Sequence, residues 1–304
     1  MTRRARHLES FFFGLIPATT LAMLRIVVGG LTLVWAATLL GQVDPLLTWL
    51  RVDPVADIGW WQFWPSAPTS FVVAAVIGLM VASGLMTIGM WTKAATWGVF
   101  LLVLILQRYN PTVFNGGDFI LRSVLLFGLA FSPAGAYLSV DSWRKAGEID
   151  WKAPMVPAWT LRFIQLHISL GYVLTVLLKL RGQTWIGGTA MWYAFGLEGL
   201  TRFDLPVWVS SPPIGSILGW ATLAVELAVG VGVWFRRTRH FVLVAGVLLH
   251  LGIAVLFEIG FFTHVMIASY IAFLPSRDDV RMWLPGIRSR KLLESARSLD
   301  PNPV

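Results

Sequence analysis

The sequence contains no cysteine and few charged residues. Without cysteine the chain cannot form disulfides, thiolate metal sites or dithiol redox relays, so redox chemistry would require a non-protein cofactor. It also lacks a His-Glu-x-x-His motif, and we predict no metal site. Charged residues make up 13% of the chain, whereas an ordinary soluble domain has about 25%. Water is therefore not the main solvent of this protein.

Apolar sequence is abundant instead. Hydrophobic residues make up 56% of the 304 residues, and the mean hydropathy is +0.70. One helical crossing of a bilayer takes about 20 residues, and the chain has eight apolar runs near this length. We expect an all-α, polytopic membrane helix bundle with about eight transmembrane helices and short re-entrant or interfacial segments. The predicted spans are residues 19–42, 69–91, 94–107, 118–133, 158–180, 213–235, 239–257 and 259–274.

The third and fourth runs are short, at about 15 residues each. They would either cross as tilted helices or form two re-entrant halves that meet at residues 110–118. We favour tilted spans because the charge distribution then agrees with a single orientation. The predicted parts are a basic N-terminal segment (1–18), a transmembrane domain (19–275) and a C-terminal tail (276–304). We expect the first span to be an uncleaved signal anchor, since no small-residue cleavage site is evident.

Lysine and arginine gather on one side of this predicted topology. With eight spans, 16 of the 24 basic residues lie on the side of the N-terminus and four on the opposite side. The positive-inside rule then places both termini in the cytoplasm. We interpret the net charge of +8 as a topology signal rather than a nucleic-acid surface. The two long outer loops, residues 43–68 and 181–212, are rich in tryptophan, and residues 186–200 are predicted to form an interfacial helix.

The fifth span carries a stripe of polar residues. Steps of three, four, three and seven residues place all of them on one helical face. Lipid offers these groups no hydrogen-bond partner, so the face is expected to point into the bundle. A simpler interpretation of the lysine is that it extends to the outer headgroups. The stripe consists of Arg162, Gln165, Ser169, Tyr172 and Lys179.

Other ionisable residues lie within the later spans. Glu226 is near the middle of the sixth span and needs a partner, for which Lys179, Arg122 or a histidine are candidates. A structural interhelical bond explains this glutamate as well as a catalytic role does. His250 and His264 would lie at similar depths if their helices are antiparallel, although a buried histidine most often bonds a neighbouring group.

A polar turn joins the third and fourth spans. Asn115 and two glycines allow a sharp bend, and Asp118 can cap the following helix while pairing with Arg122 one turn later. Helix capping alone explains each of these polar residues. The alternative is that the turn lines the outer mouth of a pocket.

Several of these segments together resemble the horizontally transferred transmembrane (HTTM) domain family, which is similar to the transmembrane half of vitamin K-dependent gamma-carboxylase. The matching pieces run in family order over roughly residues 20–275. They are Asn115-Gly-Gly-Asp118-Phe-Ile-Leu-Arg122, Phe131-Ser-Pro-Ala-Gly135 with Ser139-Val-Asp141, Gln165 with Tyr172, Lys179-Leu180, Trp185 and Gly188, Glu226-Leu227, and His250 with Phe257-Glu-Ile-Gly-Phe-Phe262 and Met266.

The resemblance implies that Lys179 is a base toward a vitamin K-type hydroquinone or menaquinone, because a lysine removed from water beside other cations can lose its proton. His250 and Glu226 would tune it or relay protons. Carboxylases of this family carry a large extra-membrane C-terminal portion, whereas this chain ends about 30 residues after the last predicted span. We therefore expect a small or lipid-soluble substrate. The expected binding residues are Asn115, Asp118, Arg122, Arg162, Gln165, Tyr172, Trp185 and His264.

Two classes of function follow. The first is a membrane enzyme, a carboxylase-like lyase or quinol-dependent oxidoreductase of the bacterial plasma membrane, with lipids and a quinol or small peptide as partners and no nucleic acid. The second is a non-catalytic factor for maturation, export or immunity of a small peptide, which would use the outer loops as its contact surface. A transporter is less favoured, because the sequence shows no inverted repeat.

Overall fold

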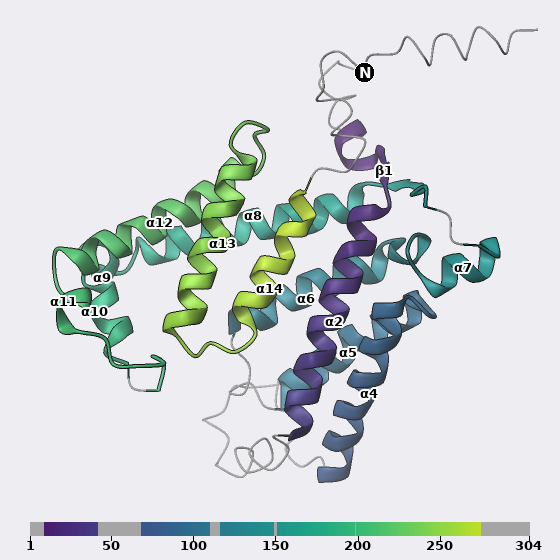
Figure 1. Ribbon diagram of the computed structural model, residues 1–304, viewed down its shortest axis with the longest axis horizontal. Coiled ribbons are helices and arrows are strands. Elements are labelled where there is room, and N and C mark those ends of the chain that lie inside the picture. The colour runs from purple at the N-terminus through teal and green to yellow at the C-terminus, as the bar shows by residue number, and fades with distance from the viewer. Residues whose placement is uncertain (1–8, 42–67, 110–115, 149–150, 198, 275–304) are drawn as a thin grey trace, which may run out of the picture. The chain divides into compact units, whose positions relative to one another are not determined.

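The computed structural model describes residues 9–41, 68–109, 116–148, 151–197 and 199–274, with their side chains except those of residues 108–109 and 116–121. The all-α fold class is confirmed. Each predicted span contains a helix, and the only β-structure among the described residues is one antiparallel pair and an isolated bridge. The main helices are α2 (Thr19–Gly41), α4 (Thr69–Ile88), α5 (Thr92–Tyr109), α6 (Gly116–Phe131), α8 (Trp159–Lys179), α12 (Ile214–Gly232), α13 (Arg239–Leu256) and α14 (Phe262–Ser269), which η3 (Tyr270–Phe273) continues (Figure 1).

Five of these helices are long and apolar enough to cross a bilayer, judged by length and composition. They are α2, α4, α8, α12 and α13, while residues 92–107, 122–131 and 262–273 form shorter apolar helices. Many of their large apolar side chains, such as Leu178, Phe241 and Leu248, are exposed, as expected where lipid covers the surface. The chain is a membrane protein, and eight crossings stay a prediction.

The helix predicted over residues 186–200 is shorter than expected: the helix that lies within this range covers residues 190–195. The connection from α8 to α12 contains α9 (Gln183–Ile186), α10 (Ala190–Phe195) and α11 (Val207–Ser210). Glycines separate the first two of these helices, and Gly188 between them has a positive φ of 72°. Figure 1 shows all three helices beside the neighbouring ends of α8 and α12. Residues 43–67 of the other long outer loop, and Asn115, lie outside the described residues.

Contacts between chain segments define two ends of the helix bundle. At the first, called the proximal end, β1 (Leu15–Pro17) pairs with β2 (Met155–Pro157), so α2 and α8 begin side by side. The ring of Trp234, just after α12, lies 6.0 Å from that of Phe11 and 5.9 Å from that of Phe273. The entry to α2, the exit of α12 and the end of η3 therefore share the proximal end.

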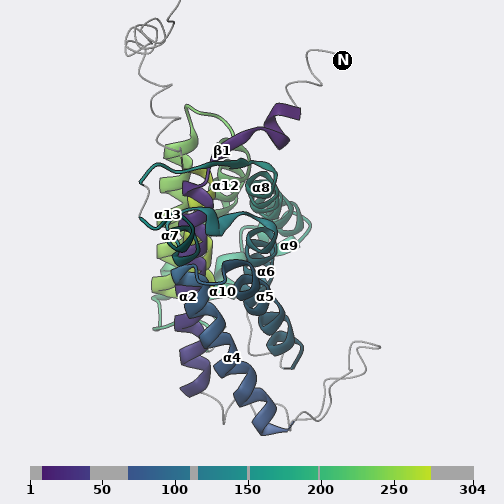
Figure 2. The ribbon, with the colours of Figure 1, turned by 90° about the vertical axis from the view of Figure 1, so that its right-hand side faces the viewer.

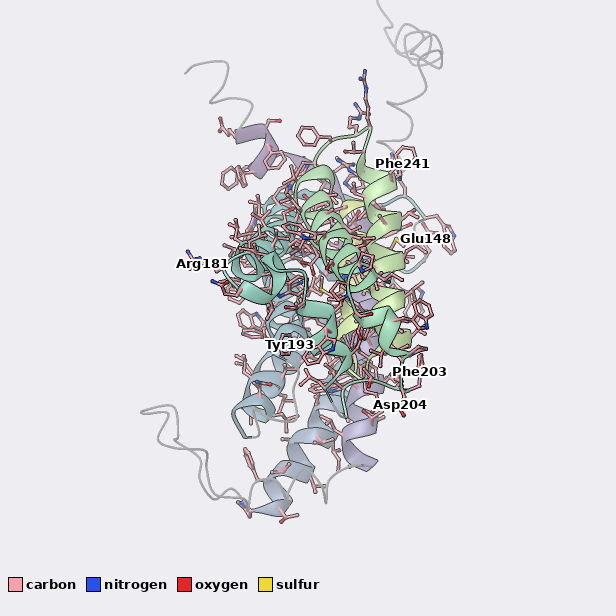
Figure 3. All side chains as sticks on the ribbon, turned by 90° about the vertical axis from the view of Figure 1, so that its left-hand side faces the viewer. Glu148, Arg181, Tyr193, Phe203, Asp204 and Phe241 are labelled. Carbon is pink, nitrogen blue, oxygen red and sulfur yellow. The ribbon has the colours of Figure 1, made fainter. Side chains whose placement is uncertain are left out.

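The opposite, distal end contains the connections from α8 to α12 and from α13 to α14. A bridge joins Thr201 to Phe257, which directly follows α13. Figure 3 shows Phe241 near the start of α13, and Phe203 and Asp204 of the α8–α12 connection beside the opposite end of that helix. From α8 onward, the described helices therefore run alternately between the proximal and the distal end.

The proximal end is built around a buried arginine. α2 and α4 pack side by side (Figures 1 and 2), and Arg25 of α2 is completely buried between them. Its guanidinium donates to the carbonyls of Met86 and Thr87, at 2.8 and 2.9 Å, and to that of Leu138 at 2.5 Å. The first two belong to the last turn of α4, where carbonyls lose their regular helical partners, although that of Met86 also accepts from the N–H of Gly89 at 3.2 Å. Arg25 therefore caps α4 from a neighbouring helix.

A carboxylate, that of Asp141, binds the α5 side of the same α4–α5 turn. Asp141 lies in α7 (Val140–Ala146), after the short helix η2 (Ala134–Ala136). It accepts from the backbone N–H of Trp91 at 2.9 Å and from the N–H and hydroxyl of Thr92, both at 2.7 Å. These N–H groups open α5, so Asp141 caps α5 as Arg25 caps α4. The tight α4–α5 turn is thus held from both sides.

Candidate functional site

The polar stripe of α8 faces its neighbouring helices, as the sequence predicted. At its distal end the ammonium of Lys179 lies 2.5 Å from Oε1 of Glu226 on α12. The glutamate is buried, and the lysine side chain keeps 21% of its surface exposed. Long helical side chains lean toward the helix N-terminus, which lets Lys179 reach back into the bundle. The lysine therefore makes an interhelical ion pair.

An aromatic ring covers the lysine from the connecting segment. Nζ of Lys179 lies 4.8 Å from the centre of the Trp185 ring, on α9. A cation and an indole at this separation attract each other. The turn after α8 brings this ring into place, because the backbone bends at Gly182 immediately after the helix. Trp185 and Glu226 thus hold the ammonium from two different elements.

One part of the resemblance differs from this geometry. The base in that scheme is a lysine beside other cations, whereas the partner of Lys179 here is a carboxylate. Proton transfer within such a pair leaves a neutral amine next to a neutral acid, so the pair can still act as a base in a low-dielectric setting.

Further into the bundle, three buried side chains form a hydrogen-bonded triad. The hydroxyl of Tyr172 lies 2.7 Å from Nε2 of His250 on α13, and it also makes a short hydrogen bond with the hydroxyl of Tyr270 on η3. All three residues are at most 5% exposed. Electrostatic interactions connect the triad with the ion pair, between Lys179 and His250 and between Glu226 and both tyrosines.

Two polar atoms in this region have no hydrogen-bond partner among the described residues. They are Oε2 of Glu226 and Nδ1 of His250, both buried. Buried polar atoms are nearly always paired, so an unpaired one requires an explanation such as a bound ligand or water. These two atoms come from adjacent helices and lie in the part of the bundle that contains the ion pair and the triad.

The proximal half of the stripe makes structural bonds. Ser169 accepts from the indole N–H of Trp234 at 2.7 Å, and Gln165 donates to the carbonyl of Ala272 at 2.6 Å. Arg162 donates to Gln165 at 2.7 Å, and its guanidinium stacks 4.4 Å from the centre of the Phe11 ring. Ser169 and the two predicted binding residues, Arg162 and Gln165, therefore join α8 to the segment after α12, to η3 and to the N-terminal segment.

Other predicted site residues lie elsewhere. Arg122 is buried against α2, where it donates to Thr32 at 3.0 Å and stacks 4.6 Å from the centre of the Trp35 ring. His264 is exposed, and its ring packs beside Phe261. The structure therefore does not bring His264 into the triad. The side chain of Asp118 and the whole of Asn115 lie outside the described residues.

Tyr270 was not among the predicted site residues. It stands in a run of small and apolar residues, Ile267-Ala-Ser-Tyr-Ile-Ala-Phe273, where its aromatic ring looks like ordinary packing. Gly246 on α13 lets it enter, because a Cβ at that position would lie 2.9 Å from Cζ of Tyr270. In the sequence, the indication that a bulky side chain packs here was Gly246, one helical turn before His250.

A family-level comparison covers the region that contains these residues. The model of the HTTM domain matches residues 13–277 of the chain. The chain belongs to the HTTM family. No solved structure matches it. The matched region of this HTTM chain includes every residue of the ion pair and the triad, and also Arg25 and Asp141, which cap α4 and α5.

Proposed function

We propose that this HTTM chain is a membrane enzyme in which Lys179 and Glu226 together accept a proton from an apolar, hydroxyl-bearing substrate of the quinol class. The observation that carries the proposal is the half-satisfied carboxylate, Glu226. A purely structural buried ion pair is stable only when the remaining lone pairs also find partners. Here Oε1 holds the lysine while Oε2 is buried without a partner among the described residues.

The pair takes up the proton without building net negative charge in the bilayer. Before the step, the ammonium of Lys179 and the carboxylate of Glu226 sum to zero. The O–H bond of the substrate breaks, and the proton moves to Oε2, or to Nζ after the lysine has passed its own proton to Oε1. In both routes the pair ends with an ammonium and a carboxylic acid. No electron moves in this step.

A quinol fits the groups that are present. An orphaned acceptor, Oε2 of Glu226, matches a hydroxyl donor, and the ring of Trp185 offers an aromatic face. When bound, a hydroquinone such as menaquinol or reduced vitamin K supplies an acidic hydroxyl and two reducing electrons. Lys179, Glu226 and Trp185 are the residues expected to hold it.

The experiment uses the full-length chain in lipid nanodiscs with reduced 2-methyl-1,4-naphthoquinone and oxygen. Oxygen consumption is measured above that of empty nanodiscs. We expect a protein-dependent rate that falls by about 100-fold or more in Lys179→Ala and Glu226→Gln, since a positioned acid or base contributes about 10² to 10⁴. Lys145→Ala, an exposed lysine on α7, is the matched control and retains the rate. If Lys179→Ala retains the rate, Lys179 is not the base. If the wild-type protein does not raise oxygen consumption above that of empty nanodiscs, the enzyme proposal fails and the non-catalytic role toward a small peptide is favoured.

We also propose that the proximal end faces the cytoplasm of a bacterial cell, with the ion pair toward the outer half of the bilayer. The support is the distribution of charge. The described connections and helix ends at the proximal end carry seven basic residues, and the α8–α12 connection carries two. The proximal residues are Lys93, Arg144, Lys145, Lys152, Arg236, Arg237 and Arg239, and the distal ones are Arg181 and Arg202.

The native sequence has no cysteine, so single cysteines report orientation directly. Glu148→Cys and Asp204→Cys are exposed positions in the proximal and distal connections (Figure 3). In intact cells a membrane-impermeant maleimide is expected to label Asp204→Cys only, and Glu148→Cys only after lysis. The reverse pattern would invert the topology.

A further inference from the structure

The hydrogen-bonded triad on α8, α13 and η3 constrains the protonation of its histidine. A neutral imidazole carries one proton, on Nδ1 or on Nε2. Nε2 of His250 bonds the hydroxyl of Tyr172, and that hydroxyl also bonds Tyr270. Nδ1 has no partner among the described residues. The two possible tautomers therefore leave different numbers of protons and lone pairs unsatisfied.

With the proton on Nδ1, the bonds form a continuous chain. Tyr270 donates to Tyr172, Tyr172 donates to Nε2 of His250, and only the Nδ1–H group is left without an acceptor. With the proton on Nε2, that N–H donates to Tyr172, so one phenolic proton of the tyrosine pair has no acceptor and Nδ1 is an empty acceptor. Two groups are then unsatisfied instead of one. Because each unsatisfied buried group destabilises the fold, the first tautomer is favoured.

We propose that Tyr270 and Tyr172 hold His250 in the Nδ1–H form, so that the buried Nδ1–H is a hydrogen-bond donor reserved for an oxygen atom of the substrate. This inference rests on the proposed function for the identity of that substrate. Tyr172 and Tyr270 are positioning residues, since they act through the histidine. The site then offers one acceptor, Oε2 of Glu226, and one donor, Nδ1–H of His250, which suits a ligand that both donates and accepts.

The surroundings hold the triad in this arrangement. His250 is 3% exposed, so water does not compete freely for its ring. The hydroxyl of Tyr270 lies against the backbone of Gly246, where an added Cβ would also meet Val229 at 3.0 Å. Thr263 of α14 donates to the backbone carbonyl of His250 at 3.4 Å, which ties the two helices together at this level. The tyrosine therefore has little room to swing away from its partner.

The test is nuclear magnetic resonance of the full chain in nanodiscs with ¹⁵N-labelled histidine. The signals of His250 are identified by their loss in His250→Gln. Coupling to the ring protons separates Nδ1 from Nε2, and a protonated nitrogen resonates far upfield of a bare one. We expect His250 to be protonated on Nδ1 in wild type. A proton on Nε2 in wild type overturns the proposal.

Variants connect this tautomer with the tyrosines. Tyr172→Phe removes the donor to Nε2 and is expected to produce a mixture of tautomers. Gly246→Ala is expected to shift the His250 signals by displacing Tyr270, whereas Gly252→Ala is the matched control on the same helix, because a Cβ there meets nothing within 4 Å. If Tyr172→Phe and Gly246→Ala both leave the His250 spectrum unchanged, the tyrosines do not set the tautomer.

Reduced 2-methyl-1,4-naphthoquinone then tests the donor. Binding is expected to shift Nδ1 of His250 more than Nε2, and Lys145→Ala should show the same shift. A quinol that is turned over without shifting Nδ1 overturns the assignment of this donor to the substrate, while the proposed function survives. If His250 is protonated on Nδ1 but the protein does not turn over the quinol, the proposed function and the donor role toward a substrate are both wrong. The assignment of the tautomer to the two tyrosines is then still correct.

Discussion

Two carboxylates in this chain use their oxygens differently. Asp141, at the proximal end, accepts three hydrogen bonds over both oxygens and caps a helix. Glu226, within the bundle, uses one oxygen for Lys179, while the other has no partner among the described residues. A carboxylate whose oxygens all have hydrogen-bond partners suits a structural role, whereas a carboxylate with an unpaired oxygen suits contact with a ligand.

The largest expected effect separates activity from stability at the ion pair. Lys179→Met should abolish quinol-dependent oxygen consumption, a loss of about 10² to 10⁴, and should destabilise the protein by about 3 kcal/mol because Glu226 is left unpaired. Adding Glu226→Leu should restore most of the stability, since an apolar pair of similar size replaces the ions. The double variant should stay inactive.

Thermal unfolding in nanodiscs and the oxygen assay are the two measurements for this series. Recovery of activity in the double variant would show that the ion pair is structural, and would remove the distinction between Glu226 and Asp141.

The next effect is expected at Arg25 and concerns folding alone. Arg25→Met removes the donor to the carbonyls of Thr87 and Leu138, while the carbonyl of Met86 keeps its bond from the N–H of Gly89. Each buried group that loses its partner costs about 1–3 kcal/mol. We expect a loss of about 3–5 kcal/mol in thermal stability once relaxation is allowed. The ¹⁵N signals of His250 should not change in the protein that remains folded. Arg181→Met, an exposed residue, is the control.

The helices and the polar stripe of α8 were predictable from the sequence, which also offered Lys179 as one of three kinds of candidate partner for Glu226. The helices follow from long apolar runs, and the stripe on α8 follows from spacing within one helix. His264 failed to join because α14 has only 8 residues after an irregular loop, so its rotation relative to α13 cannot be read from a sequence period. Tyr270 was missed because its partners, Tyr172 and Gly246, are distant in sequence and meet it only through packing of three elements.

A smaller effect is expected where α8 and α12 approach closely beside the ion pair. A Cβ at Gly230 would lie 3.1 Å from Cβ of Tyr172 and 3.2 Å from the carbonyl oxygen of Ser169. Gly230→Ala should push the helices apart and cost about 1–3 kcal/mol. Because the Lys179–Glu226 bond spans the same interface, oxygen consumption should fall as well.

Gly219→Ala on the same helix is the matched control, since a Cβ there meets nothing within 4 Å. It should be neutral or slightly stabilising, because alanine restricts the unfolded chain. Equal losses of activity in both variants would mean that the spacing of α8 and α12 does not matter to the pair.

The smallest effect expected is a pH dependence at the saturated carboxylate. Burial by itself raises the pKa of Asp141, but the hydrogen bonds from Thr92 and Trp91 and the charge of Arg144 outweigh it, and the net pKa lies below 3.8. A depressed folded pKa means that Asp141 stabilises the fold above the unfolded value. That contribution decreases as pH falls below about 3.8 and is lost once pH passes the folded pKa.

Thermal unfolding of wild type and Asp141→Asn in nanodiscs between pH 6 and pH 3 measures the difference. The two proteins should differ most at pH 6 and converge toward pH 3, because protonated Asp141 and asparagine are both uncharged. A gap independent of pH would mean that the geometry of the cap, rather than its charge, holds the α4–α5 turn.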